Sequence, residues 1–195
     1  MLQKIAFKFL LACIVIAAFL HSFGEPLLQL LLPLFKWQIQ AMDDQYKLLS
    51  LSIKSLGTDR VFSMQVILAK PLILGGQFIL PDPRGVATAS SIIAHVWQML
   101  VIFLAVLVAL PVKQFTEYFR RIAFALPVLI VVLMLDIPFS LLATLKALIL
   151  EQLKVDGFSA LLFWNDILEG GGRLVLGLVG GLVSDWLANS LKINN

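Results

Sequence analysis

Few residues of this chain could do chemistry, and their spacing matches no catalytic motif. His21, His95 and Glu25 could meet at one edge of an apolar segment, but no HExxH or other ligand-spaced cluster is present. The single cysteine, Cys13, lies inside an apolar stretch where a thiolate is disfavoured, and it forms no CxxC motif or intrachain disulfide. We therefore expect no enzymatic activity, metal or cofactor, and a membrane-embedded enzyme built on the two histidines ranks last among three functions.

Asp136 is the sharpest polar feature of the sequence. In LMLDIPFS its carboxylate falls near the middle of an apolar stretch, where an unpaired charge costs at least about 2.5–3.5 kcal/mol. Pairing with Ser140 one turn later, contact with backbone groups freed beside Pro138, or a basic residue of a neighbouring helix or subunit would each explain it. A proton or ion pathway is the functional alternative. Structural pairing is the favoured interpretation of Asp136 and Ser140.

Glycines near the end of the chain predict close helix packing. Gly177 and Gly181 form a GxxxG pattern, with Gly180 beside them, and this pattern lets another helix approach closely. No GK[ST] follows, so a phosphate-binding loop is not indicated. Glu169 and Arg173 are four residues apart across three further glycines, a spacing that allows an ion pair if the helix begins early. Alternatively, these glycines let the backbone bend between the amphipathic segment and the last span.

The composition explains why these residues need a membrane around them. Of 195 residues, 60% are hydrophobic and 14% are charged, whereas soluble domains average roughly 45–50% and 25%. Surplus hydrophobic surface on this scale must be buried against lipid or a partner. The basic residues form no run or aromatic-interleaved face, so nucleic acid is not an expected partner. The sequence predicts an α-helical integral membrane protein.

Four apolar stretches are the predicted transmembrane helices. They cover residues 5–23, 91–112, 122–150 and 173–187. The first is expected to stay as an anchor, because its apolar run is long and no A-x-A-like cleavage site follows. The third exceeds one crossing, so it tilts, kinks at Pro138 or emerges from the membrane. The predicted organisation is helix 1 at residues 1–25 and helices 2–4 within residues 91–195, with an amphipathic segment at 158–169 that is too short to span.

Residues 26–90 are predicted to form a β-rich lobe outside the membrane. The apolar segment 26–37 either lies at the interface or extends the first helix. Beyond it, apolar and polar residues alternate around residues 49–54, and a second such run covers 60–69. Between the runs, Gly57 and Asp59 supply turn chemistry, so a β-hairpin is expected. Residues 77–80 offer another short strand.

Basic residues near the short connections orient the chain, because positive charge is retained on the cytoplasmic side. With a cytoplasmic N-terminus, the basic residues inside are Lys4, Lys8, Lys113, Arg120, Arg121 and Lys192. Those outside are Lys146, Lys154 and Arg173. The larger inside set supports this orientation, which makes residues 26–90 extracytoplasmic.

The order of these parts resembles the small membrane proteins encoded alongside exosortases, in particular the exosortase H-associated type. The likeness lies in the basic-then-apolar first helix, the outer segments LLSLSIKS and RVFSMQVILA, and the stretch LVALPVKQFTEYFRRIAFALPVLIVVLML, and it covers roughly residues 1–150. It implies an accessory role beside a bacterial envelope protein-sorting transpeptidase. Those enzymes use Cys, Arg and His on successive spans, a pattern that this chain lacks because Cys13 is misplaced.

Our leading hypothesis is a non-enzymatic accessory or scaffold subunit of the bacterial inner membrane. It contacts lipid, and its outer β lobe and glycine-faced last helix bind another membrane or periplasmic protein. The large outer segment without chemistry motivates it, and a homo- or hetero-oligomer is compatible with it. The alternative is a small transporter or channel component that uses Asp136 as a coupling carboxylate.

Overall fold

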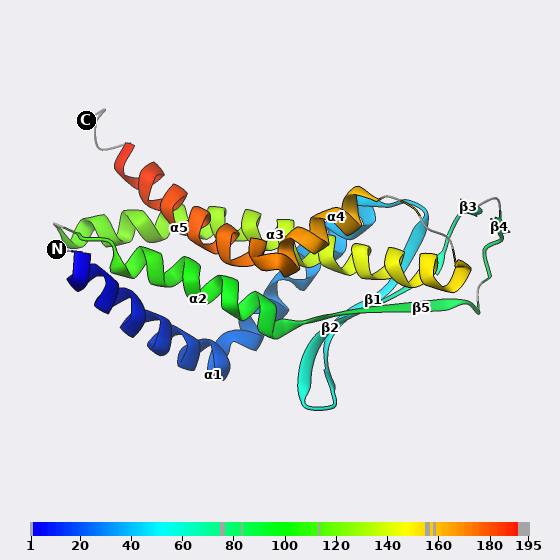
Figure 1. Ribbon diagram of the computed structural model, residues 1–195, viewed down its shortest axis with the longest axis horizontal. Helices are drawn as coiled ribbons and strands as arrows, with labels where there is room; N and C mark the ends of the chain where they lie inside the picture. Colours follow the sequence, from blue (N-terminus) through cyan, green and yellow to red (C-terminus); the bar gives the residue numbers. More distant parts are fainter. Residues whose placement is uncertain are drawn as a thin grey trace. The chain divides into compact units, whose positions relative to one another are not determined.

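The computed structural model describes residues 2–74, 77–82, 84–112, 114–154, 157 and 159–190 (Figure 1). Lys113, Lys192 and Phe158, which entered the predictions of orientation and of the segment 158–169, lie outside the described residues. The chain divides into two compact units. The helical unit comprises Met1–Glu25, His95–Leu133 and Gly171–Asn195, and the lobe unit comprises Pro26–Ala94 and Met134–Gly170.

The described chain is mostly helical, with strands between its first two helices. The helices are α1 (Leu2–Met42), α2 (Ile93–Ala109), α3 (Phe115–Leu153), α4 (Ala160–Ile167) and α5 (Arg173–Ser190). A kink within Leu168–Gly172 joins α4 to α5, and Gly171 at this kink has a non-helical φ of 107°, which favours glycine. The strands are β1 (Tyr46–Leu56), β2 (Asp59–Leu68), β3 (Leu72–Leu74), β4 (Gln77–Ile79) and β5 (Val86–Ile92).

Three helical stretches are long and apolar enough, by length and composition, to cross a membrane. They are Gln3–Met42, Thr116–Leu153 and Ala160–Ser190. The second of the four predicted spans is represented by α2, which is apolar but has only 17 residues. It is short because β5 keeps the chain extended up to Ile92, and because Pro111 disfavours helical conformation in the residue before it.

Two helices are longer than the predicted spans, and for residues 26–37 the alternative that they extend the first helix is confirmed. Residues 26–37 continue α1 through Pro26 and Pro33, so the helix reaches Met42. Likewise α3 begins at Phe115, within the segment expected to connect two spans, and continues through Pro138 to Leu153.

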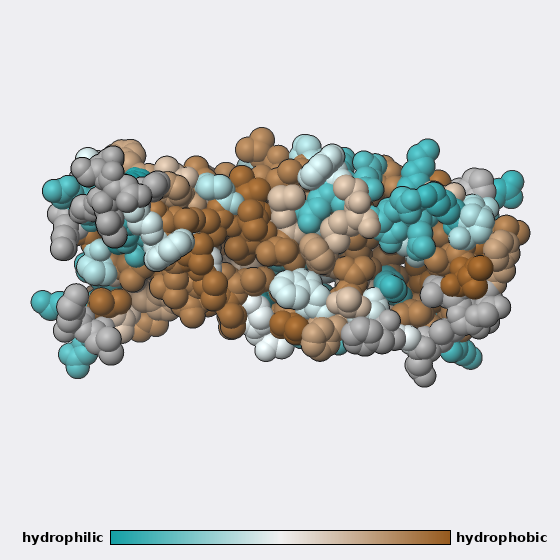
Figure 2. Space-filling model, turned by 90° about the horizontal axis from the view of Figure 1, so that it is seen from above, coloured by the Kyte–Doolittle hydropathy of each residue, from teal (hydrophilic) through white to brown (hydrophobic). Residues whose placement is uncertain are grey.

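In the helical unit, α2 supplies the centre of the packing. Phe103 and Leu107 of α2 form a buried cluster with Ala125 of α3. On the α1 side, a Cβ atom built on Gly24 would lie 2.3 Å from the ring of Trp97, so only glycine permits this contact. Large apolar side chains on the outward faces of α1 and α5 remain exposed. In Figure 2 most of the face in view is hydrophobic.

The lobe unit contains the predicted hairpin, which is confirmed. β1 and β2 pair antiparallel from Tyr46↔Leu68 to Leu56↔Asp59, with a register shift between residues 48 and 50. Gly57 in the turn has a φ of 62°. β5, which the sequence did not indicate, pairs with the other edge of β2. β4 lies at the predicted third strand and pairs with β3 in a separate two-stranded sheet.

One face of the three-stranded sheet is covered by the second half of α1. Phe62 and Met64 of β2 are fully buried, and the ring of Phe35 from α1 meets Phe62 edge-on, with 6.4 Å between ring centroids. An ion pair between Lys70 and Asp44 closes the base of the hairpin, and it lowers the pKa of the Asp44 carboxyl.

Tyr46 provides a test of the lobe in solution. Burial, assisted by the charge of Asp43, raises the pKa of Tyr46 to about 12. Because the folded state holds this proton more tightly than the unfolded state, the lobe should lose stability as pH rises from about 10 towards 12. Ultraviolet absorbance of a Tyr118→Phe variant should show phenolate forming near pH 12, and the additional change Tyr46→Phe should remove that transition. Ionisation near pH 10 would contradict the burial of Tyr46.

Candidate functional site

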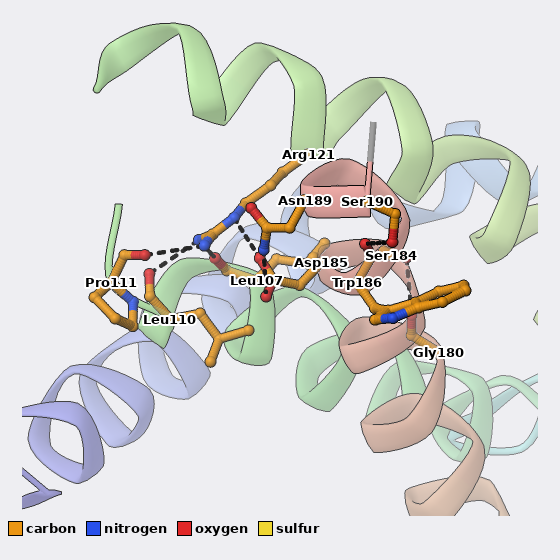
Figure 3. A network of polar contacts seen from close by, with 10 residues as sticks. All are labelled: Leu107, Leu110, Pro111, Arg121, Gly180, Ser184, Asp185, Trp186, Asn189 and Ser190. Carbon is orange, nitrogen blue, oxygen red and sulfur yellow. Dashed lines mark hydrogen bonds and ion pairs between the residues drawn. The ribbon is translucent and has the colours of Figure 1, made fainter. Parts of the chain in front are cut away.

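Among the described residues, both units contain a cluster of buried polar groups, and that of the helical unit is built around Arg121. The Nε atom of Arg121 in α3 lies 2.6 Å from Oδ1 of Asp185 in α5 (Figure 3). The other guanidinium nitrogens donate to three backbone carbonyls at the end of α2. These are the carbonyls of Leu107 at 3.4 Å, Leu110 at 3.0 Å and Pro111 at 2.9 Å.

The end of α2 explains why an arginine is needed there. The last carbonyls of a helix have no intrahelical donor, and a cation near them is favourable. Arg121 supplies both donors and charge, and Asp185 neutralises the guanidinium. Asn189, one turn further along α5, donates to the other oxygen of Asp185 at 3.1 Å. The contacts of Arg121 therefore join α2, α3 and α5. The network is largely shielded from solvent, because the side chains of Arg121 and Asp185 are only 6% and 20% exposed.

The glycine face of α5 (Gly177, Gly180 and Gly181) is buried in the helical unit. A Cβ atom on Gly177 would lie 2.6 Å from the carbonyl oxygen of Met99 in α2, and one on Gly181 would lie 2.9 Å from Val106. A Cβ atom on Gly180 would meet Phe103 at 2.9 Å. The face predicted for helix packing is therefore occupied by α2 of the same chain. The expectation that this face also binds another protein is wrong, because α2 already covers it.

The cluster of the lobe unit surrounds Pro138 in α3. Proline has no N–H, so the carbonyl four residues earlier, that of Met134, loses its helical donor. The side-chain amide of Gln38 in α1 donates to this carbonyl at 2.9 Å. The indole N–H of Trp164 in α4 donates to the next carbonyl, that of Leu135, also at 2.9 Å.

Asp136 lies within this cluster and is 1% exposed. The hydroxyl of Ser140, also buried, donates to Oδ1 of Asp136 at 3.3 Å. Thr144 follows one turn later and donates to the carbonyl of Ser140 at 2.9 Å. The arrangement places the buried Asp136 side chain beside a proline-loosened turn, where Gln38 and Trp164 donate to the carbonyls of Met134 and Leu135.

The role of Gln38 can be tested with a double-mutant cycle. Replacing Gln38 by leucine leaves the Met134 carbonyl buried without this donor, so we expect a loss of about 1–3 kcal/mol of unfolding free energy. In a Pro138→Ala background the restored backbone N–H can donate instead, and the same replacement should cost much less. Denaturant unfolding of all four proteins in mild detergent measures the difference. An equal loss in both backgrounds would rule out this explanation of the hydrogen bond.

The structure places the other predicted residues as follows. Glu169 is exposed in the lobe unit and accepts a hydrogen bond from Asn165 at 2.8 Å. Arg173 belongs to the helical unit and is buried, and its ion pair with Glu169 stays a prediction. His21 lines an apolar hollow of the helical unit together with Trp97. Cys13 is half-buried on α1. Among the residues described, no group of three or more His, Cys, Asp or Glu side chains could hold a metal ion.

Arg121, Gln38 and Trp164 were not recognised from the sequence as site residues. Arg121 was read only as an orienting charge. The two prolines could have indicated these residues. Pro111 follows the end of α2 and Pro138 removes a donor within α3, so each leaves backbone carbonyls that need a hydrogen-bond donor from elsewhere.

Comparison of the chain with protein-family models, with curated proteins and with solved structures found no match.

Proposed function

We propose that this chain is a multi-pass protein of the bacterial inner membrane and acts as a non-enzymatic accessory or scaffold subunit. Its N-terminus is cytoplasmic, residues 26–90 are extracytoplasmic, and the lobe contacts another integral membrane or periplasmic protein. The resemblance to exosortase-associated proteins suggests an envelope protein-sorting transpeptidase as that partner.

The dimensions of the helical unit support four crossings. Its segments of α1, α2, α3 and α5 have 24, 15, 19 and 18 residues, around the roughly 20 that a bilayer core requires. The shortest belongs to α2, which has 17 residues in all and so a length of about 26 Å, a mismatch that slight thinning of the bilayer accommodates. We propose that the crossing part of α3 ends where the helical unit ends, at Leu133, so that Asp136 lies beyond it. That position favours a structural carboxylate over an ion-coupling one at mid-membrane.

Exposed apolar side chains on the lobe carry the proposed role in binding. Around the two-stranded sheet, Ile73, Phe78 and Leu80 are 70%, 62% and 66% exposed. Neighbouring apolar groups left open to water are typical of a contact surface, and an aromatic side chain among them is a common anchor of an interface.

Photo-crosslinking tests this contact in living cells. A benzoylphenylalanine introduced at Phe78 should give one discrete adduct with another polypeptide. The matched control is Thr58, which is also exposed but lies at the polar turn of the β1–β2 hairpin, and it should give none. Adducts with lipid alone at Phe78, or identical adducts at both positions, would argue against a protein partner.

The orientation is tested separately by labelling single cysteines. In a Cys13→Ala background, a cysteine at Ser55 of β1 should react with a membrane-impermeant maleimide in intact spheroplasts. A cysteine at Thr116, exposed near the start of α3, should react only after permeabilisation. The reverse pattern would place the N-terminus outside.

A further inference from the structure

The three-stranded sheet of the lobe unit has two outer strands, β1 and β5, whose free edges differ in protection. A register shift between residues 48 and 50 interrupts β1, and the exposed Lys47 and Lys54 place charges along it. Bulges and lysines are common protection for an edge strand, because an unpaired edge otherwise attracts another chain. The free edge of β1 is therefore guarded against further pairing.

The free edge of β5 lacks this protection along all seven residues of the strand, each of which the structure describes. Val86–Ile92 contains no charged residue and no proline, and it pairs with β2 without a register shift. Val86 and Ile92 are 49% and 40% exposed, and Thr88 between them is also exposed. This edge is therefore long enough and open enough to receive another strand.

The β1–β2 hairpin shows which backbone groups point towards β5. Its two-residue turn makes Leu56 and Asp59 a hydrogen-bonded pair. Hydrogen-bonded and non-bonded pairs alternate along an antiparallel ladder. The odd-numbered residues of β2 from 59 to 65 therefore direct their N–H and C=O groups to β1, and the even-numbered residues direct theirs to β5.

On β5 the same alternation leaves Thr88 and Ser90 with backbone groups that point outward. Met64, an even-numbered residue of β2, pairs with Ala89, so the N–H and C=O groups of Ala89 are directed to β2. Thr88 and Ser90 flank Ala89 and direct theirs away from the sheet. Two N–H donors and two C=O acceptors thus stand at the free edge with the spacing that a further strand needs.

We propose that the free edge of β5 binds an extended, uncharged segment of the partner protein, which adds a fourth strand to the sheet. Backbone hydrogen bonds to Thr88 and Ser90 hold the segment, and its apolar side chains cover Val86 and Ile92. The inference rests on the proposed function, because the segment belongs to the partner proposed there.

The position of β5 favours the partner as the source of this strand. Leu80, part of the apolar surface assigned to the partner, precedes Val86 by six residues, so at most about 20 Å of chain separates them. A partner seated on Leu80 is therefore within reach of the edge. The side chains of β5 offer no charge to a charged segment, which is why an uncharged one fits better.

Amide hydrogen exchange of the full chain in mild detergent, read by NMR, tests the assigned edge. The amides of Thr88 and Ser90 should exchange many-fold faster than those of Ala89 and Ser91, which are directed to β2. Equal exchange rates for the four amides would overturn the proposal, because the outward groups would then be no freer than the paired ones.

Photo-crosslinking from Phe78 in living cells tests the added strand. Thr88→Pro removes an outward N–H and no bond to β2, so the lobe should still fold. Its adduct yield should fall roughly tenfold, because a carbonyl of the bound segment loses its donor. The matched control is Ser55→Pro, an exposed position of β1 whose N–H points outward by the same alternation, and it should keep the wild-type yield.

Thr88→Lys is a second variant with an intact backbone, and its charge at the edge should also lower the yield. An unchanged yield in a folded Thr88 variant, or an equal fall in Ser55→Pro, would overturn the proposal and leave the partner contact at Phe78 standing. An adduct of twice the mass of the chain would overturn it too, because the lobe would then bind a second copy. Loss of the wild-type adduct altogether would refute the proposed partner contact, and the added strand with it.

Discussion

Arg121→Leu is expected to lower the unfolding free energy by about 3–5 kcal/mol, the usual loss when one member of a buried ion pair is removed. The substitution leaves the carboxylate of Asp185, which is 20% exposed, without its cation. It also removes the donors from the carbonyls of Leu110 and Pro111 at the end of α2. For a chain of this size the melting temperature in mild detergent should fall by roughly 10 °C.

Two further variants decide whether the ion pair is the cause. Arg121→Leu combined with Asp185→Leu should recover much of the loss, because an apolar pair replaces the orphaned charge. The matched control is Arg120→Leu, which changes the preceding arginine of α3 and should shift the melting temperature far less. Equal effects at the two arginines, or no recovery in the double variant, would show that the network of Figure 3 does not stabilise the helical unit.

Local sequence patterns predicted the parts of the fold whose contacts are close in sequence. The hairpin was visible because alternation and turn residues lie within one short segment, from Tyr46 to Leu68. β5 was not visible, because Val86–Ile92 consists mainly of small residues and becomes a strand only by pairing with β2. The sequence does not decide whether α1 continues through Pro26 for a related reason, since proline normally interrupts a helix and tertiary contacts determine whether it continues.

For the polar residues too, contacts between residues close in sequence were predictable and contacts created by the fold were not. Ser140 was named beside Asp136 because a spacing of four places both on one face of a helix, and the hydrogen bond is present. Gln38 and Met134 are 96 residues apart, and Arg121 meets carbonyls that exist as acceptors only because α2 ends nearby. Such partners are created by the fold, so residue type alone does not show them.

Gly177→Ala is expected to destabilise the helical unit by about 1–3 kcal/mol, although alanine favours a helix more than glycine does. The new Cβ atom would lie 2.6 Å from the carbonyl oxygen of Met99, which is backbone and cannot rotate away. The helices α2 and α5 must therefore separate, and the cost of lost contacts exceeds the gain in helix propensity of up to about 1 kcal/mol. A second alanine at Gly181, beside Val106 and the carbonyl of Phe103, should add to the loss.

Gly170→Ala is the matched control, because no atom lies within 4 Å of its added Cβ and its φ is not in the left-handed region. Its melting temperature should stay close to that of the wild-type protein. A wild-type melting temperature for Gly177→Ala would instead mean that α2 does not lie against this face. If Gly177→Ala lowers stability and also prevents crosslinking from Phe78, the packing of α2 on α5 is coupled to partner binding. If crosslinking persists, the glycine face serves only the stability of the helical unit, and binding depends on the lobe.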